Sequence, residues 1–478
     1  MQRVVCVIIR NIMKKQTAQD VPEEENRKMN SKSKEKGEGL AQPRAKKQRG
    51  RGLLIAIGVI AALVLILFAL YQIPAIHDRA YFHVTTLRSK IFYFLRPPAK
   101  SEFEISGETT MDAQVMATLT AFAPTATPTT APEPTFAATS TAEAAVPPTA
   151  TPLPTKIPAA VQIEGIVQEY QRFNSCGPAN LVLNMRYWGW EGIQEDVEAV
   201  VKPVLQDLNV SPSELLKYVK GHTDLDAILR LGGDIDLLKK LVAAGYPVLA
   251  QRGYVNRDDG WMGHYGIVDG YDDAEGAVHI PDTFNGNIWL KYEEFQRVWD
   301  EFHGTYLVVF PPEEREIVLS ILGDDADVDY NLDRTLEKFR ERAETVDRSE
   351  QYFAYYSLGE LLVMKKQYVD AAAAFDQAFA VYGWLPVDDR PWRMLWYQVG
   401  PYEAYYYTGR YKDVVSITYK TIKDANTPAL PETFLWSGRA NIALGNTDTA
   451  IFDFKRALQW HPGWEPALAE LEKLGVTP

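Results

Sequence analysis

The sequence predicts a globular domain of mixed α and β structure followed by an all-α repeat region, both behind one membrane-spanning helix and a Thr- and Pro-rich linker. Three observations lead to this prediction. The chain has 478 residues, more than one hydrophobic core usually organises. A long apolar run and a Thr-, Ala- and Pro-rich segment lie in its first third. Beyond them, apolar residues follow strand and helix periods in a mixed stretch and then a helical one.

The N-terminal arm, residues 1–52, is basic although the protein as a whole is acidic. The arm holds 14 Lys and Arg against 6 Asp and Glu, a balance of +8, whereas the net charge of the chain is -13. An acidic body repels nucleic-acid phosphates, so we do not expect nucleic acid as a partner. The basic arm instead indicates orientation at a membrane.

The predicted transmembrane helix occupies residues 53–71. It contains the run "LLIAIGVIAALVLILFAL", which is 18 residues long and uncharged, and a spanning helix needs roughly 17–25 residues. A buried core helix or a signal peptide is the alternative, but the apolar part of a signal peptide is usually about 7–15 residues long behind a short start. Five basic residues between positions 44 and 51 precede the run. They predict a single-pass protein of the cell membrane with a cytoplasmic N-terminus and the rest outside the cytoplasm.

Two segments connect the predicted span to the globular part. In the juxtamembrane segment, 72–106, Val84, Leu87 and Ile91 have helical spacing, which fits either an interfacial helix or a helix that docks on the body or on a partner. In the linker, 107–160, stretches such as "PTATPTTAPEPTF" lack the apolar periodicity of a core. The linker is therefore expected to be an extended spacer.

The mixed domain is expected over residues 161–312. Helical patterns extend over 192–231 and include a capping box of Ser211 and Glu214. Another helix is predicted to begin after Asp234 as its N-cap. The runs "PVLAQ", "HYGIVDGY", "AVHIPDT" and "GTYLVVF" are predicted strands.

The repeat region is expected over residues 330–475. Small and large residues recur there with the same internal offsets, and Gly359 with Phe375 corresponds to Gly438 with Phe454. Glycine allows two helices to approach, and the aromatic ring fills the space between them. A degenerate copy lies between the two, and the pattern resembles tetratricopeptide repeats.

The chain has only two cysteines, Cys6 and Cys176, which excludes a disulfide framework. Cys176 precedes "GPANLVLNMRYWG", where a helix is expected to start, and Pro178 suits the first turn of that helix. A helix N-terminus stabilises a thiolate through its dipole and free N–H groups. The placement predicts a reactive thiol, and the alternative is a structural cysteine.

A nucleophilic cysteine needs a base, and His264 is the best candidate. Five of the seven histidines lie near the membrane, in the repeats or beside glycines in expected loops. The other two, His264 and His279, flank the turn "DDAEG". A hairpin centred on Asp273 would place His264 opposite Asp282, where the carboxylate could hold the imidazole in the required tautomer. The alternative is a histidine at a strand end without a catalytic role.

Gln171 precedes Cys176 by five residues. From there a side-chain amide can donate to an oxyanion beside the helix N-terminus. A single glutamine is more often a solvated surface residue, so its assignment depends on the rest of the set.

Four pieces, "YQRFNSCGPANLVLNMRYWG", "GYPVLAQ", "GHYGIVDGYDD" and "HIPDTFNG", resemble the peptidase C39-like family of papain-type cysteine peptidases. The resemblance covers about residues 165–310. It implies a papain-like α+β fold, with a helical part bearing the cysteine packed on an antiparallel sheet that bears the histidine and the aspartate. It also implies Cys176 as nucleophile, His264 as base, Asp282 as orienting acid and Gln171 at the oxyanion.

These observations predict a membrane-anchored, extracytoplasmic cysteine peptidase that hydrolyses peptide bonds. Its partners would be a protein or peptide substrate and a protein bound by the repeats, with no cofactor and no metal. Family members fused to transporters cleave leader peptides, but this chain lacks a P-loop motif. The alternatives are a catalytically silent scaffold that binds proteins at the cell surface, and an acyl or peptidyl transferase.

Overall fold

The computed structural model describes residues 58, 83–84, 87–88, 90–93, 157–256 and 260–478. The predicted basic arm, the predicted span apart from Gly58, and nearly all of the predicted linker lie outside these residues. Within the described part of the chain, no helix is both long and apolar enough to cross a membrane. Contacts divide the chain into two units, Met1–Gln72 and Ile73–Pro478. The second unit contains an α+β domain and a helical C-terminal region.

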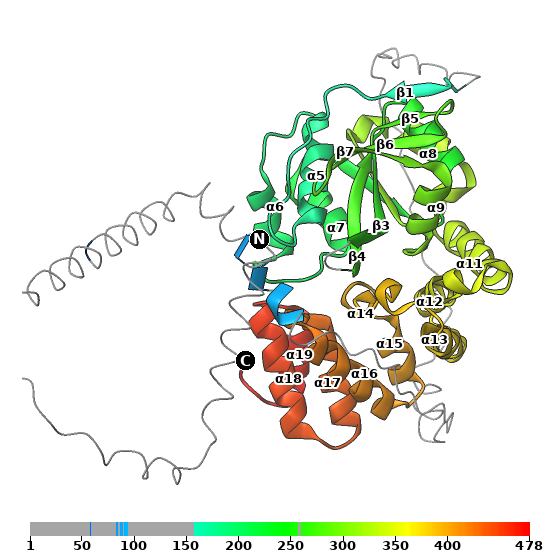
Figure 1. Ribbon diagram of the computed structural model, residues 1–478. Coiled ribbons are helices and arrows are strands. Elements are labelled where there is room, and N and C mark those ends of the chain that lie inside the picture. Colours follow the sequence, from blue (N-terminus) through cyan, green and yellow to red (C-terminus); the bar gives the residue numbers. More distant parts are fainter. Residues whose placement is uncertain (1–57, 59–82, 85–86, 89, 94–156, 257–259) are drawn as a thin grey trace, which may run out of the picture. The chain divides into compact units, whose positions relative to one another are not determined.

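The α+β domain contains two four-stranded sheets, with the strand orders β1-β5-β6-β7 and β2-β8-β3-β4. Figure 1 labels β1, β5, β6 and β7 of the first sheet and β3 and β4 of the second. Every strand pair is antiparallel. The strands are β1 (Ala160–Gln162), β2 (Asp226–Arg230), β3 (Val248–Asn256), β4 (Gly260–Val268), β5 (Gly270–Asp272), β6 (Ala277–Asp282), β7 (Gly286–Lys291) and β8 (Tyr306–Phe310). The helices are α5 (Cys176–Tyr187), α6 (Gln194–Val201), α7 (Pro212–His222), α8 (Ile235–Ala243) and α9 (Tyr292–Asp300).

Local sequence signals account for several of these elements. Ser211 caps α7 by accepting a hydrogen bond from the Glu214 backbone N–H, and the Glu214 carboxylate accepts one from the Ser211 N–H. The Asp234 side chain caps α8 by accepting from the Leu237 N–H. The predicted capping box, the predicted start of α8 and the four predicted strand runs are confirmed.

The helical pattern expected over 192–231 is wrong at its end, where β2 forms instead. Ala227 and Ile228 are buried, and β2 pairs along its whole length with β8. A short apolar run fits a buried strand and a buried helix equally well, so its partner strand decides between them.

The predicted hairpin register is also wrong. β5 pairs with β6 so that Gly270 lies opposite His279, which centres the hairpin between Ala274 and Glu275 and not on Asp273. The Cα partner of His264 is Arg252 on β3. By strand pairing, His264 and Asp282 belong to different sheets, which corrects the expectation of one sheet bearing both residues.

The helical C-terminal region begins after β8. Its helices are α10 (Arg315–Leu322), α11 (Val328–Thr345), α12 (Arg348–Met364), α13 (Tyr368–Tyr382), α14 (Met394–Tyr397), α15 (Gly400–Tyr407), α16 (Tyr411–Asp424), α17 (Pro431–Ala443), α18 (Thr447–Trp460) and α19 (Glu465–Lys473). Short 3-10 helices lie at Pro312–Glu314, Gly323–Ala326 and Val387–Asp389.

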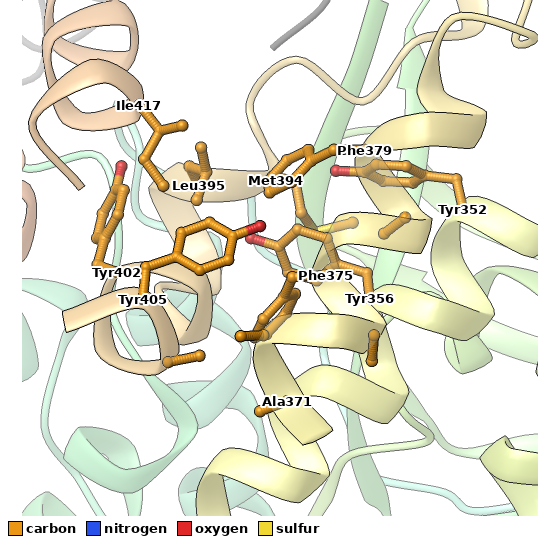
Figure 2. Packing of buried hydrophobic residues seen from close by; sticks show 14 of the residues in the cluster. Tyr352, Tyr356, Ala371, Phe375, Phe379, Met394, Leu395, Tyr402, Tyr405 and Ile417 are labelled. Carbon is orange, nitrogen blue, oxygen red and sulfur yellow. The ribbon is translucent and has the colours of Figure 1, made fainter. Parts of the chain in front are cut away.

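Two helix pairs of this region pack through a glycine against an aromatic ring. A Cβ atom at Gly359 on α12 would lie 2.5 Å from the Phe375 ring on α13. A Cβ atom at Gly438 on α17 would lie 2.4 Å from the Phe454 ring on α18. Figure 2 shows Phe375 among the buried aromatic side chains that fill the first of these cores. The assignment to tetratricopeptide repeats stays a prediction.

The described part of the juxtamembrane segment is helical, as predicted. Val84, Leu87 and Ile91 are exposed by 63%, 59% and 51%. Tyr93 makes an edge-on ring contact with Trp392 of the helical region, with centroids 5.3 Å apart. The described part of the segment thus contacts the body through Tyr93 and exposes Val84, Leu87 and Ile91. An interfacial role for these three residues stays a prediction.

One hydrophobic core joins the α+β domain to the helical region. Trp261 on β4 and Phe302 after α9 belong to the same buried cluster as the aromatic residues of α12 and α13. Polar contacts reinforce this junction. The Arg393 guanidinium donates to the Trp261 carbonyl at 2.9 Å, and the Gln398 amide donates to the Glu301 carbonyl at 3.1 Å.

Candidate active site

Cys176 is the first residue of α5, as its sequence context predicts. It is partly exposed, whereas the helix residues that follow it are buried. Gly177 allows the helix to approach β4, because a Cβ atom there would lie 3.3 Å from the Tyr265 ring. The sulfur therefore lies at the positive end of a helix dipole, beside the strand that carries His264.

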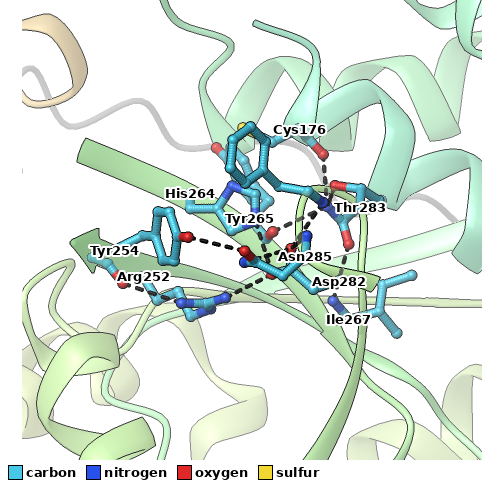
Figure 3. Close-up of polar contacts among 12 residues, drawn as sticks. Cys176, Arg252, Tyr254, His264, Tyr265, Ile267, Asp282, Thr283 and Asn285 are labelled. Carbon is cyan, nitrogen blue, oxygen red and sulfur yellow. Dashed lines mark hydrogen bonds and ion pairs between the residues drawn. The ribbon is translucent and has the colours of Figure 1, made fainter. Parts of the chain in front are cut away.

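The structure brings His264 and Asp282 to Cys176 (Figure 3). The His264 imidazole lies close enough to the Cys176 thiol to lower its pKa. Its Nε2 atom lies 2.9 Å from Asp282 Oδ2, which leaves Nδ1 for the sulfur. The predicted Cys, His and Asp thus form one connected set. His264 and Asp282 were expected to be direct partners on adjacent strands. In the structure they lie on different sheets and meet through their side chains.

Asp282 accepts hydrogen bonds on both carboxylate oxygens. Oδ2 accepts from Arg252 at 2.8 Å as well as from His264. Oδ1 accepts from the backbone N–H groups of Phe284 and Asn285, each at 2.8 Å, and from the Asn285 side-chain amide at 3.2 Å. A carboxylate with so many donors is held ionised and in a fixed orientation.

The charges of these groups depend on one another. Burial opposes ionisation of the thiol, but the hydrogen bond and positive charge of His264 outweigh it and lower the pKa of Cys176. Burial likewise opposes protonation of His264, yet Asp282 and the Cys176 sulfur raise its pKa to about 9. For Asp282, burial favours the neutral acid, but His264 and Arg252 hold the pKa well below its usual range. At neutral pH the site therefore holds an imidazolium and a carboxylate, and the imidazolium favours the thiolate form of Cys176.

Lys202, just after α6, adds a buried positive charge behind the thiol. Its ammonium donates to the carbonyls of Phe173 and Asn174, at 2.6 and 3.0 Å, and lies 3.3 Å from the Ser175 hydroxyl. Burial lowers the pKa of Lys202 to about 8. Its charge also lowers the pKa of Cys176. Lys202 thus fixes the loop that presents the sulfur and favours the thiolate.

Gln171 lies in the loop before α5 and is partly exposed. Its backbone N–H donates to the Thr283 carbonyl at 2.8 Å. Its side-chain Oε1 accepts from the Thr283 hydroxyl at 3.0 Å. The structure thus ties Gln171 to the residue that follows Asp282.

The second candidate histidine, His279, has a different environment. It lies on β6 opposite Gly270 of β5. Its Nδ1 is 2.6 Å from Asp269 Oδ1, and its ring packs on Trp289. His279 is therefore a packed histidine with its own carboxylate partner, separate from Cys176.

Comparisons with known proteins find one family match. Residues 155–307 match the family model described as the Peptidase_C39 like family. The match supports the C39-like peptidase family for the α+β domain, and with it a cysteine peptidase-like fold.

Two solved structures are similar to the C39-like domain. One is a double glycine motif protease from an AMS/PCAT transporter in complex with the leader peptide, with 19% identity and a TM-score of 0.24, covering 31% of this chain and 94% of the other. The second is described as a C39-like peptidase from Bacillus anthracis, with 16% identity and a TM-score of 0.27, covering 31% of this chain and 96% of the other. No curated protein matches the sequence.

Sequence reasoning missed several residues that build the site in the C39-like domain. Arg252 is buried, and its pairing with Asp282 depends on the β3–β4 register. Lys202 reaches the Cys176 loop from a helix end, and no local pattern marks it. In the sequence, Asn180 is a polar residue within an apolar helix. This pattern indicates a buried side chain that forms hydrogen bonds, but it does not identify the partners. Among the described residues, no group of three His, Cys, Asp or Glu side chains is placed to bind a metal ion.

Proposed function

We propose that the protein is a membrane-anchored, extracytoplasmic cysteine peptidase that hydrolyses peptide bonds. The observation that carries the proposal is the connected set of Cys176, His264 and Asp282 at the start of α5. A thiol with a lowered pKa beside an oriented imidazole is the arrangement that nucleophilic catalysis requires. The C39-like family match over residues 155–307 favours peptide bonds as the substrate class.

The proposed reaction has two steps. The Cys176 thiolate attacks the carbonyl carbon, and the His264 imidazolium gives its proton to the leaving amine as the C–N bond breaks. Neutral His264 then takes a proton from water, whose oxygen attacks the thioester and releases the acid and the thiolate. Asp282 holds the Nε2 proton of the imidazole and stabilises its positive charge.

The Gln171 amide and the Cys176 backbone N–H would stabilise the oxyanion of each tetrahedral intermediate. In related chemistry, loss of one such donor lowers the rate of the chemical step by about 100- to 1,000-fold. The Cys176 N–H suits this role because it lies in the first turn of a helix, where backbone donors have no partner within the helix.

The helical region would bind a protein substrate or partner. A hollow of about 490 Å³ on its surface is lined by apolar and charged side chains, among them Leu358, Leu362, Arg340 and Asp370. The basic arm and the apolar run of residues 53–71 support anchoring in the cell membrane, with the C39-like domain outside the cytoplasm.

Proteome-derived peptides incubated with the detergent-solubilised full chain test the proposal. We expect wild-type protein to generate new peptide termini that Cys176→Ala does not, because the thiolate is the nucleophile. Cys6→Ala is the matched control and should cut like wild type. Glycinamide in the same mixture reveals transfer, because a transferase would give amidated C-terminal products.

Two outcomes would contradict the peptidase. Cleavage that persists in Cys176→Ala would show that the thiol is not the nucleophile. A wild-type protein that generates no new termini and leaves Cys176 inert would favour the scaffold that only binds.

A further inference from the structure

We propose that Thr283, held in place by Asn180, is a positioning residue that orients the side-chain amide of Gln171 toward the oxyanion. This inference rests on the proposed function and deepens it. It concerns a chain of directed hydrogen bonds that runs from the edge of β4 through Asn180 and Thr283 to Gln171.

The first link is Asn180 on α5, which is fully buried. Its Oδ1 accepts from the Ile267 backbone N–H at 3.1 Å. Because a backbone N–H can only donate, this contact fixes which end of the amide is oxygen. β4 is an edge strand of its sheet. Asn180 therefore forms hydrogen bonds with β4 backbone groups, the Ile267 N–H and the Tyr265 carbonyl, on the side where β4 has no neighbouring strand.

The opposite end of the Asn180 amide donates toward the candidate site. Its Nδ2 lies 2.8 Å from the Cys176 carbonyl, 3.0 Å from the Tyr265 carbonyl and 3.0 Å from the Thr283 hydroxyl. The same Asn180 amide group thus contacts both Thr283 and Cys176, the first residue of α5. Thr283 Oγ1 is therefore an acceptor toward Asn180.

The second link is Thr283 itself, which is also fully buried. A hydroxyl group has a single proton. Because Oγ1 accepts from Asn180, its own proton is available for Gln171 Oε1, which lies 3.0 Å away. The Gln171 carbonyl oxygen is thereby held at Thr283, which turns Nε2 to the other side as a donor.

The direction of this amide matters for the proposed chemistry. A flipped Gln171 would present its carbonyl oxygen to a developing negative charge and repel it. Two further hydrogen bonds to backbone carbonyls, one of them from the Gln168 side chain, hold the loop before α5 next to Thr283. The Gln171 N–H donates to the Thr283 carbonyl, and the Gln168 amide donates to the Asp282 carbonyl at 3.1 Å. Thr283 therefore sets both the position and the polarity of the candidate oxyanion donor.

Two probes of the full chain, in a Cys6→Ser background, separate positioning from support of the fold. Iodoacetamide alkylation of Cys176 forms no oxyanion and reports the thiolate. N-acetylglycinal binds by addition of the Cys176 sulfur to the aldehyde carbon, which gives a tetrahedral hemithioacetal. Its oxygen, protonated by His264, occupies the position of the oxyanion. The affinity for the aldehyde therefore reports the oxyanion donor, and we measure it as protection from alkylation.

We expect Thr283→Val, which keeps the shape but removes the hydroxyl, to weaken aldehyde binding by about 10-fold, less than the full loss of a donor. The alkylation rate should stay within about 2-fold of the background protein, because the helix dipole and His264 are untouched. Thr283→Ser keeps the hydroxyl and should restore aldehyde binding to within about 3-fold. In a Gln171→Ala background, Thr283→Val should have no further effect on aldehyde binding.

The proposal is overturned if Thr283→Val binds the aldehyde like the background protein. It is also overturned if alkylation and aldehyde binding fall together and Thr283→Ser restores neither, because Thr283 would then only support the fold. If Thr283→Val does not fold, Thr283→Ala replaces it in the same comparison. Failure of the background protein to bind the aldehyde would contradict the peptidase itself, and the positioning role with it.

Discussion

At the residue scale, Cys176 and His264 form a pair in which each charge stabilises the other. Burial disfavours both charges, and each group offsets this effect on the other. Asp282 stabilises the positive charge of His264 by accepting a hydrogen bond from Nε2 of its ring. Arg252 in turn balances the negative charge of Asp282. The reactivity of the Cys176 sulfur thus depends on three other side chains, from β3, β4 and the end of β6.

The pairing predicts a thiol that reacts at low pH. In a Cys6→Ser background, the rate of Cys176 alkylation should stay high well below the usual thiol pKa. A free thiol is only a few per cent ionised at pH 7, so His264→Ala should slow alkylation at this pH by at least about 10-fold, because burial then acts without its opposing charge. Peptide hydrolysis should decline above about pH 9, where His264 loses the proton needed by the leaving amine. Alkylation should not decline there, because it needs only the thiolate.

Stopped-flow alkylation and hydrolysis, each followed from pH 4 to 10, check this prediction. His222→Ala is the matched control, because His222 stacks on Tyr218 at the end of α7 and is not among the groups that shift the pKa of Cys176. An unchanged alkylation profile in His264→Ala would show that the imidazole does not control the thiol.

At the element scale, the helix pairs of the C-terminal region depend on glycines that admit aromatic rings. Gly438 and Phe454 on α17 and α18 repeat the contact of Gly359 and Phe375 on α12 and α13. The paired residue types were visible as a recurring pattern. The starts of α7 and α8 were also visible in the sequence, because each capping residue forms its hydrogen bond with a residue three positions later.

Gly438→Ala should destabilise the protein even though alanine favours helices by about 1 kcal/mol over glycine. The added methyl group would meet the Phe454 ring at 2.4 Å, and such overpacking costs about 1–3 kcal/mol. We therefore expect a net loss of free energy of unfolding, measured by urea denaturation. Gly221→Ala is the control, because Gly221 lies in α7 with no atom within 4 Å of an added Cβ, and it should be neutral or stabilising. Equal effects of the two substitutions would contradict the packing argument.

At the scale of the whole molecule, the C39-like domain and the helical region share a core. The Trp261 side chain is fully buried, donates to Glu301 Oε2 at 2.7 Å and contacts Tyr397 of α14. Trp261 also belongs to β4, the strand that carries His264. Packing of the helical region therefore supports the strand that positions the candidate base.

Trp261→Ala should lower the free energy of unfolding by about 3–5 kcal/mol, because it leaves a large cavity in the shared core. Hydrogen exchange followed by mass spectrometry should increase in both β4 and α12. Trp289→Ala is the matched control at a position that is 52% exposed, and its cost should be about 1 kcal/mol or less. Faster exchange confined to the C39-like domain would show that the two parts do not share a cooperative core.

Features whose physical cause lies within a few residues could be predicted from the sequence. These are the capping box at Ser211, the helix start at Cys176 and the apolar periods of the strands, because hydrogen bonds and burial patterns there are local. The tertiary structure decided how His264 meets Asp282 and which groups surround the thiol. The positions of Arg252, Lys202 and Thr283 depend on turn length and strand register across separations of about 30 to more than 100 residues. No local propensity carries that information, because a shift in register changes every partner at once.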